Sequence, residues 1–349
     1  MTTRSHAQTC IRSVPQEPVA VQEEEVEETA TPVKALENLG IQSGDIRRLI
    51  EAGYHTVDIL TMTSKRHLSK VKGMSEMKCE KIMEAAGKLC SRRIDFQTAA
   101  DYKVARQERV KHITTGSKEL DRILGGGVET GSITMVYGEN RCGKSQLALT
   151  LCVAGFMPEA IGGAEGKAIY IDTEGSFRPE RVQIIAERFG LEPKFILEHV
   201  MFARVYTTDR LEESLIAAGA MLATEPFAVL VIDSLIQPFR VEYSGRGELA
   251  ERQQRMNLIL AQLKKIADEH QVAVFVTNQV TADPGASMFI AAQTKAVGGN
   301  ILAHACDHIL CLRKGKGDQR IAKIIDSPCL PEEEAIFSIG SGGVTEPTE

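Results

Sequence analysis

One short stretch constrains the fold of this chain more than any other: Gly138-Glu139-Asn140-Arg141-Cys142-Gly143-Lys144-Ser145 fits the pattern G-x-x-x-x-G-K-[ST]. It directly follows a strand-like apolar run, 132–137, and directly precedes a helical run, 146–153, which is the context that a P-loop requires. Glycines let the backbone fold around an anion, and the exposed amides and the helix N-terminus supply positive potential. Lys144 can reach the terminal phosphates of a nucleotide, and Ser145 can ligate magnesium. The sequence therefore predicts that residues 138–146, Gln146 included, bind ATP with Mg²⁺.

Beyond residue 113, strand-like apolar runs alternate with helical segments. This rhythm predicts an α/β fold, with a mostly parallel sheet, helices on both faces and ligands at the carboxyl ends of the strands. After residue 302 three strand candidates follow one another without helices, so the sheet should end in antiparallel strands. The expected strands are 132–137, 168–172, 200–206, 228–233 and 272–277, then 308–313, 319–325 and 334–339.

Polar side chains follow three of the expected strands. Asp233 ends the run 228–233, where a P-loop protein places the carboxylate that stands beside its magnesium. Glu174 follows the run 168–172 and could polarise a water for attack on the γ-phosphate, so it is the candidate general base. Gln279 follows the run 272–277, where a neutral amide could sense the γ-phosphate. A structural amide cap explains Gln279 equally well.

The first third of the chain has a different composition. Residues 1–33 hold six glutamates and two arginines, which is about −4 of the net charge of −6, and their composition is typical of a disordered acidic tail. Residues 34–93 show helical spacing with punctuating glycines, which predicts a small helical domain. Residues 94–112 form the expected linker, and residues 113–349 the expected ATPase core.

Within the helical domain, a glycine turn at Gly73 leads into a helix start flanked by Lys70, Lys72, Lys78 and Lys81. Helix-hairpin-helix modules use such amides and lysines to hold DNA phosphates. An ordinary helix turn with a solvated basic face explains the pattern equally well.

The eight cysteines show no paired spacing of the zinc kind and no pattern of a small disulfide-rich domain, which favours a reducing compartment. No apolar run approaches eighteen residues, and no basic stretch with an apolar run opens the chain. We therefore expect neither a membrane span nor a signal peptide.

With these residues in place, the chain from about residue 36 to about residue 345 resembles the RecA superfamily, and specifically the eukaryotic and archaeal strand-exchange recombinases. The resemblance implies a RecA-like core, DNA-dependent ATPase activity and a location in the nucleus. The stretches that carry it are Ile113-Thr114-Thr115-Gly116-Ser117, Leu124-Gly125-Gly126-Gly127, residues 172–181, residues 244–253 and Asp326-Ser327-Pro328-Cys329-Leu330-Pro331.

Several roles follow from the resemblance alone. It implies DNA contacts in a loop that starts near Arg240 and contains Arg246, and in a longer loop from Thr281 to Val297 that includes Lys295. It implies that residues 96–99 dock on a neighbouring subunit through Phe96 and Ala99. It implies further nucleotide contacts at Arg181, and at positions that close over a neighbour's ATP, namely His304, Asp326 and Pro331. The functional unit would be a helical filament, although head-to-tail contacts also allow rings.

Residues 248–254 and 283–285 look more like the meiosis-specific branch of these recombinases than the general paralogue, whereas residues 174–176 look more like the general paralogue. The chain departs from the family pattern at Asn140, where an aromatic residue is usual, at Cys142, where threonine is usual, and in the second DNA loop, where cations are fewer. The expected function is an ATP-dependent recombinase that coats single-stranded DNA, pairs it with a homologous duplex and works with recombination accessory proteins. A recombination mediator of the same fold, or a hexameric DNA-unwinding motor, are the alternatives.

Overall fold

The computed structural model describes residues 31–90, 96–243, 245–281 and 295–347, without the side chains of Arg246, Thr281, Lys295 and Asn300. Nearly all of the predicted acidic tail, and most of the second predicted DNA loop, lie outside these residues. Among the residues that the structure describes, no helix combines the length and the apolar character needed to cross a membrane.

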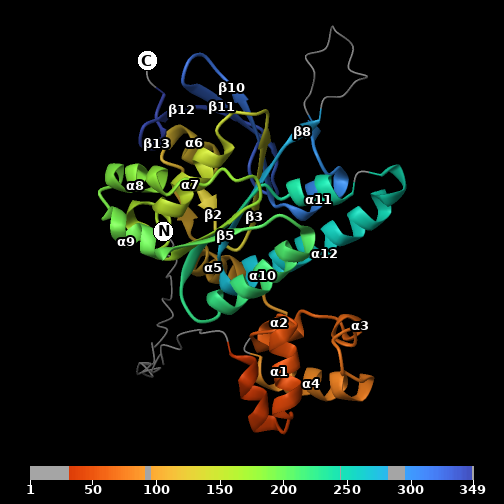
Figure 1. The fold of residues 1–349 in the computed structure, drawn as a ribbon. Coiled ribbons are helices and arrows are strands. Elements are labelled where there is room, and N and C mark those ends of the chain that lie inside the picture. Colours follow the sequence, from red (N-terminus) through yellow and green to blue (C-terminus); the bar gives the residue numbers. More distant parts are fainter. Residues whose placement is uncertain (1–30, 91–95, 244, 282–294, 348–349) are drawn as a thin grey trace, which may run out of the picture.

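Five short helices form the N-terminal part of the chain, drawn in red and orange in Figure 1. Buried apolar side chains give them a small core of their own, which includes Leu36, Leu49, Leu60 and Ile82. This helical domain touches the rest of the molecule, because Lys265 Nζ donates a hydrogen bond to Thr63 Oγ1 at 2.9 Å. The helices are η1 (Val33–Leu39), α1 (Ser43–Glu51), α2 (Val57–Thr61), α3 (Lys65–Leu68) and α4 (Glu76–Leu89).

A nine-stranded sheet organises the remainder, in the order β13-β12-β11-β10-β3-β7-β6-β4-β5. The strands from β10 to β5 run parallel to one another, and β11, β12 and β13 are added as antiparallel neighbours. The strands are β3 (Ile133–Gly138), β4 (Lys167–Asp172), β5 (Val200–Arg204), β6 (Phe227–Asp233), β7 (Ala273–Asn278), β10 (His308–Lys314), β11 (Gln319–Asp326), β12 (Glu334–Gly340) and β13 (Gly343–Thr345).

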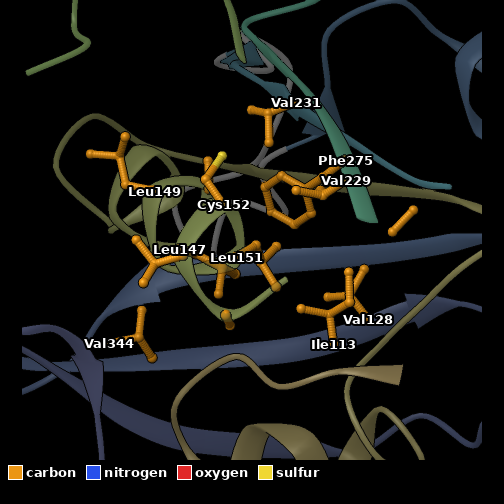
Figure 2. Close-up of a cluster of buried hydrophobic side chains, with 14 of the residues drawn as sticks. Ile113, Val128, Leu147, Leu149, Leu151, Cys152, Val229, Val231, Phe275 and Val344 are labelled. Carbon is orange, nitrogen blue, oxygen red and sulfur yellow. The ribbon is translucent and has the colours of Figure 1, made fainter. Parts of the chain in front are cut away.

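Helices cover both faces of this sheet. On one face α7 (Lys144–Ala154) packs with α8 (Pro179–Arg188) and α9 (Pro193–His199), and on the other lie α10 (Thr208–Leu222) and α12 (Leu249–His270). Figure 2 shows Leu147, Leu151 and Cys152 of α7 in one buried cluster with the strand residues Val229, Val231 and Phe275. Because α7 is apolar all round, it is buried directly behind the loop that precedes it.

The remaining elements are short. They are α5 (Ala99–Arg109), β1 (His112–Ile113), α6 (Lys118–Ile123), β2 (Val128–Glu129), η2 (Glu159–Ile161), α11 (Gln237–Glu242), η3 (Arg246–Glu248), β8 (Val280–Thr281), β9 (Lys295–Ala296) and α13 (Asn300–Ala305).

The predicted fold class is confirmed: a mostly parallel sheet ends in antiparallel strands, with helices on both faces and a helical region at the N-terminus. All eight expected strands are present, with ends that shift by one or two residues. The sequence analysis missed β1, β2, β8, β9 and β13, because strands of two or three residues are too short to show an alternating pattern.

Candidate functional site: a nucleotide pocket at the carboxyl edge of the sheet

Four neighbouring strands deliver the candidate residues to one edge of the sheet. The strands β3, β7, β6 and β4 lie side by side and run in the same direction, so their carboxyl ends meet. The P-loop follows β3, Gln279 follows β7, Asp233 ends β6 and Glu174 follows β4. The candidate residues therefore meet at the carboxyl edge of a parallel sheet, which is where ligands bind in such folds.

The P-loop is folded as an anion cradle. Gly143 has a φ of 106°, and a Cβ there would come within 2.6 Å of Ile339 Cδ1, so only glycine fits. A Cβ at Gly138 would collide with the carbonyl oxygen of Leu312. Helix α7 begins at Lys144, and its N-terminus faces the loop. The backbone thus has the close-approach geometry that a phosphate group needs.

Lys144 and Cys142 occupy the floor of this cradle. Lys144 Nζ donates hydrogen bonds to the carbonyl oxygens of Gly138 and Glu139, both at 3.0 Å, which holds the ammonium group over the loop. Cys142 is fully buried, with its Sγ 3.9 Å from Lys144 Nζ, and burial raises the pKa of this thiol. Cys142 is therefore a neutral packing residue beneath the lysine, whereas Glu139, Asn140 and Arg141 are exposed at the rim.

Asp233 is a buried carboxylate held by three hydroxyl groups. Its Oδ2 accepts hydrogen bonds from Tyr170 at 2.7 Å and Ser176 at 3.1 Å, and its Oδ1 accepts one from Thr277. Within the described part of the chain, no group of three or more acidic, histidine or cysteine side chains could hold a metal ion. Magnesium at P-loops needs only one or two carboxylates, the loop hydroxyl and substrate phosphates, so Asp233 and Ser145 fit that donor set.

Asp172 builds the turn that carries Glu174. Its two oxygens accept hydrogen bonds from the backbone amides of Glu174, Gly175 and Phe177 at 2.9, 2.7 and 3.1 Å. Arg204 of β5 adds an ion pair with Asp172 at 2.9 Å. Asp172 is therefore a buried structural carboxylate, and the turn presents Glu174 at the edge of the sheet.

Glu174, Gln279 and Arg240 form a continuous hydrogen-bonded chain. Glu174 Oε1 accepts from Gln279 Nε2 at 2.7 Å, and Gln279 Oε1 accepts from Arg240 Nη1. A cavity of about 270 Å³ beside them is lined by Gly138, Asn140, Lys144, Glu174, Gln279 and Val280. The candidate base and the candidate sensor thus share one pocket with Lys144.

Arg181 lies next to the first turn of α7. Its Nε donates to Gln146 Oε1 at 2.7 Å, and its terminal nitrogens donate to the carbonyl oxygens of Gly340 and Ser341. Partial burial lowers the pKa of Arg181. The structure therefore brings Arg181 beside the P-loop, as the expected nucleotide contact requires.

His304, Asp326 and Pro331 lie apart from this pocket and are exposed. Asp326 ends β11 opposite Ile309, near the start of β10, and β10 runs parallel to β3. Asp326 and the turn after it are therefore at the amino edge of the sheet, whereas the P-loop is at the carboxyl edge. Within one subunit Asp326 therefore lies at the opposite edge of the sheet from the P-loop, and the expected role of these residues on a neighbour's ATP stays a prediction.

The expected DNA-binding residues lie on segments that follow β6 and β7 in the chain. Arg240 lies in α11, directly after β6 and the turn that follows it, and Arg246 begins η3. Thr281 and Lys295 pair with each other across β8 and β9, and β8 follows β7 in the chain. The side chains of Arg246, Thr281 and Lys295, and residues 282–294, lie outside the described residues, so their contacts with DNA stay a prediction.

The expected docking segment is exposed on the surface of its own subunit. The exposure of Phe96 is 106%, Ala99 is exposed, and α5 has no buried residue. Thr98 caps α5, because its Oγ1 accepts from the amide of Asp101 at 3.2 Å. An apolar side chain held out on a capped helix suits contact with another molecule.

Sequence reasoning missed several side chains that hold the candidate residues, Ser176 and Thr277 among them. Tyr170 holds Asp233, Ser234 holds Glu174 and Arg204 holds Asp172. Ser234 directly follows the Asp233 strand end and could have been noticed there. Tyr170 lies inside an apolar run, and Arg204 lies on a strand that pairs with β4 only in the folded protein, so the sequence carries no local signal for either.

Comparison with known proteins agrees with this geometry. The model of the family described as Rad51 matches residues 105–347. A protein of Oryza sativa subsp. japonica described as "Meiotic recombination protein DMC1 homolog B" is 50% identical over 323 residues, covering 93% of each chain. "Meiotic recombination protein DLH1" of Candida albicans is 47% identical, over 92% of this chain and 99% of its own. "DNA repair protein RAD51" of Mycosarcoma maydis is 48% identical, over 96% of this chain and 98% of its own.

These matches confirm the resemblance that the motifs indicated, and the meiotic names among the relatives agree with the branch that residues 248–254 and 283–285 favoured. A family model over residues 105–347 and about half identity over nearly the whole chain leave one assignment: the protein belongs to the Rad51 family of RecA-like recombinases.

Proposed function

We propose that the protein is an ATP-dependent DNA recombinase that forms filaments on single-stranded DNA and catalyses homologous pairing and strand exchange in the nucleus, in meiotic recombination or recombinational repair. The observation that carries this proposal is the hydrogen-bonded chain from Glu174 through Gln279 to Arg240. It joins the phosphate pocket to α11, next to the loops from which DNA contacts are expected.

The residues of the pocket divide the work of ATP hydrolysis. Lys144 and the P-loop amides bind and orient the phosphates, and Glu174 orients and deprotonates the attacking water. Asp233 and Ser145 would hold magnesium, which when bound neutralises charge on the phosphate oxygens. In this family of sites most of the acceleration comes from positioning and electrostatics.

Gln279 gives a physical reason for nucleotide to control DNA binding. Its amide donates to Glu174 and its carbonyl oxygen accepts from Arg240, so a rotation toward a γ-phosphate breaks both hydrogen bonds. Arg240 would then be released toward the DNA side. One side chain therefore biases two sites, which is how a bound phosphate group can order a neighbouring segment.

Assembly completes the site in this proposal. Phe96 and Ala99 dock on the next subunit, while His304, Asp326 and Pro331 of one subunit close over the ATP of another. Single-stranded and double-stranded DNA are the expected partners, together with recombination accessory proteins. The described relatives carry the names of recombination and repair proteins and give no support to the mediator alternative.

A strand-exchange assay tests the proposal. Purified protein with ATP, Mg²⁺ and a circular single strand should convert a homologous linear duplex into joint molecules, and a heterologous duplex should give none. Electron microscopy of the same mixture should show helical filaments. Joint molecules that form only when a second recombinase is added would indicate a mediator, and discrete rings that unwind a duplex would indicate a motor.

A further inference from the structure

The carboxylate of Glu174 is held from one side. Its Oε1 accepts two hydrogen bonds, from Ser234 Oγ at 2.6 Å and from Gln279 Nε2 at 2.7 Å. Among the described residues, no hydrogen bond reaches Oε2. Two donors on one oxygen fix the plane of the carboxylate and leave the other oxygen available to a water in the pocket.

The two donors differ in how far their side chains can move. Gln279 is partly exposed, lines the cavity and also contacts Gln237 Oε1 at 3.3 Å, so it has other partners to turn to. Ser234 has 0% exposure. Its amide donates to Thr173 Oγ1 at 2.9 Å, and Thr173 Oγ1 donates to the carbonyl oxygen of Ser234 at 2.7 Å. Ser234 is therefore clamped between β6 and the turn after β4.

We propose that the Ser234 hydroxyl is the permanent positioning group of the Glu174 carboxylate, which keeps Oε2 aimed at the attacking water when Gln279 turns to the γ-phosphate. This inference rests on the proposed ATPase function and names a residue that acts through Glu174. Without Ser234, the departure of Gln279 would leave the base with no hydrogen bond to fix its orientation at the moment of reaction.

The chemical step itself needs only the groups already described. The water oxygen forms a bond to the γ-phosphorus, the bond to the β–γ bridging oxygen breaks and its electron pair leaves with ADP. The water proton passes to Glu174 Oε2 and later returns to solvent. Because orientation of the reacting groups supplies much of the acceleration, a base free to rotate should slow this step and leave nucleotide binding unchanged.

A purely structural role for Ser234 makes a different prediction. The backbone hydrogen bonds with Thr173 already join the turn after β4 to the residue after β6, and Ser234→Ala keeps them. Alanine also keeps nearly the same volume, so the change removes one hydroxyl group and leaves the packing in place. If the hydroxyl serves only stability, its loss should affect folding or nucleotide binding and should not depend on Glu174.

The test is a double-mutant cycle on the full chain, with ATP hydrolysis measured in the presence of single-stranded DNA. Ser234→Ala should lower kcat about tenfold, with the KM for ATP changed by less than about twofold. In a Glu174→Gln background the same change should have almost no further effect, because both variants remove the same oriented base. Ser214→Ala is the matched control, because its hydroxyl donates only to the carbonyl oxygen of Leu211 in α10.

The outcomes separate the inference from the function on which it rests. Two results would overturn the role of Ser234 alone. One is a wild-type kcat for Ser234→Ala, and the other is a loss of kcat on adding Ser234→Ala to Glu174→Gln that equals its loss in the wild-type background. A wild-type protein that hydrolyses no ATP with DNA would overturn the proposed function. If Ser234→Ala does not fold, Ser234→Cys replaces the hydroxyl by a weaker donor and should give a smaller loss of kcat in the same cycle.

Discussion

Phe96 provides the sharpest test of assembly, because the side chain contributes nothing to the packing of its own subunit. A phenylalanine that enters a pocket buries about 150–200 Å², which at about 25 cal/mol per Å² stabilises the contact by about 4–5 kcal/mol. Phe96→Glu removes this contribution and adds the cost of burying a charge. Self-association should therefore weaken by about three orders of magnitude.

The measurement is the mass of the species in solution, by light scattering over a range of protein concentrations without DNA. Phe96→Glu should give a smaller species, while thermal unfolding should match the wild type because the side chain is 106% exposed. Met77→Glu is the matched control, since it places the same charge at an exposed apolar position of α4. An unchanged mass for Phe96→Glu at every concentration would move the subunit interface elsewhere.

Other predictions concern the pocket, the DNA loop and the folded state. Lys144→Ala should abolish ATP binding in a fluorescent-nucleotide titration, whereas Glu174→Gln should keep ATP and DNA binding and slow hydrolysis. If Glu174→Gln hydrolysed ATP at the wild-type rate, Glu174 would not be the general base. Arg246→Ala should weaken binding of single strands about equally for different sequences, and should lower the slope of log affinity against log salt by roughly 0.7 per lost phosphate contact; an unchanged slope would remove Arg246 from the DNA site. Gly127→Ala should destabilise the protein by more than about 1 kcal/mol in urea, because φ is 135° and the new Cβ would collide with a neighbouring carbonyl oxygen; an unchanged midpoint would refute this. Burial lowers the pKa of His308, so below about pH 6.5 the unfolded chain binds a proton that the folded chain binds only at a lower pH. The free energy of unfolding should therefore decrease as the pH is lowered through this range, and it should decrease less steeply in His308→Gln.

Local patterns predicted most of the fold and which candidate residues lie together. The P-loop is a contiguous motif, and the strands that end in Asp233 and Asn278 are apolar runs long enough to recognise. Once a parallel sheet is expected, the carboxyl ends of its strands must meet, so the meeting of Lys144, Glu174 and Gln279 followed from the topology.

The sequence could not reveal contacts that depend on which strands become neighbours. Ser234 reaches Glu174 because β6 pairs with β4 in a register that sets Asp233 opposite Asp172, and no spacing along the chain encodes that pairing. The burial of Cys142 beneath Lys144 is likewise a property of the folded loop. The DNA contacts of the second loop remain predictions.

The placement of Asp326 and the P-loop at opposite edges of the sheet has a consequence for any open assembly. If each nucleotide is enclosed between one subunit's P-loop and the next subunit's Asp326, a chain of subunits always finishes with one uncovered P-loop at one terminus and one unused Asp326 at the other. The two termini would be chemically unlike, because only one of them retains a half-open nucleotide. Subunits would then join and leave at different rates at the two termini, so growth would have a direction set by the order of strands in the sheet.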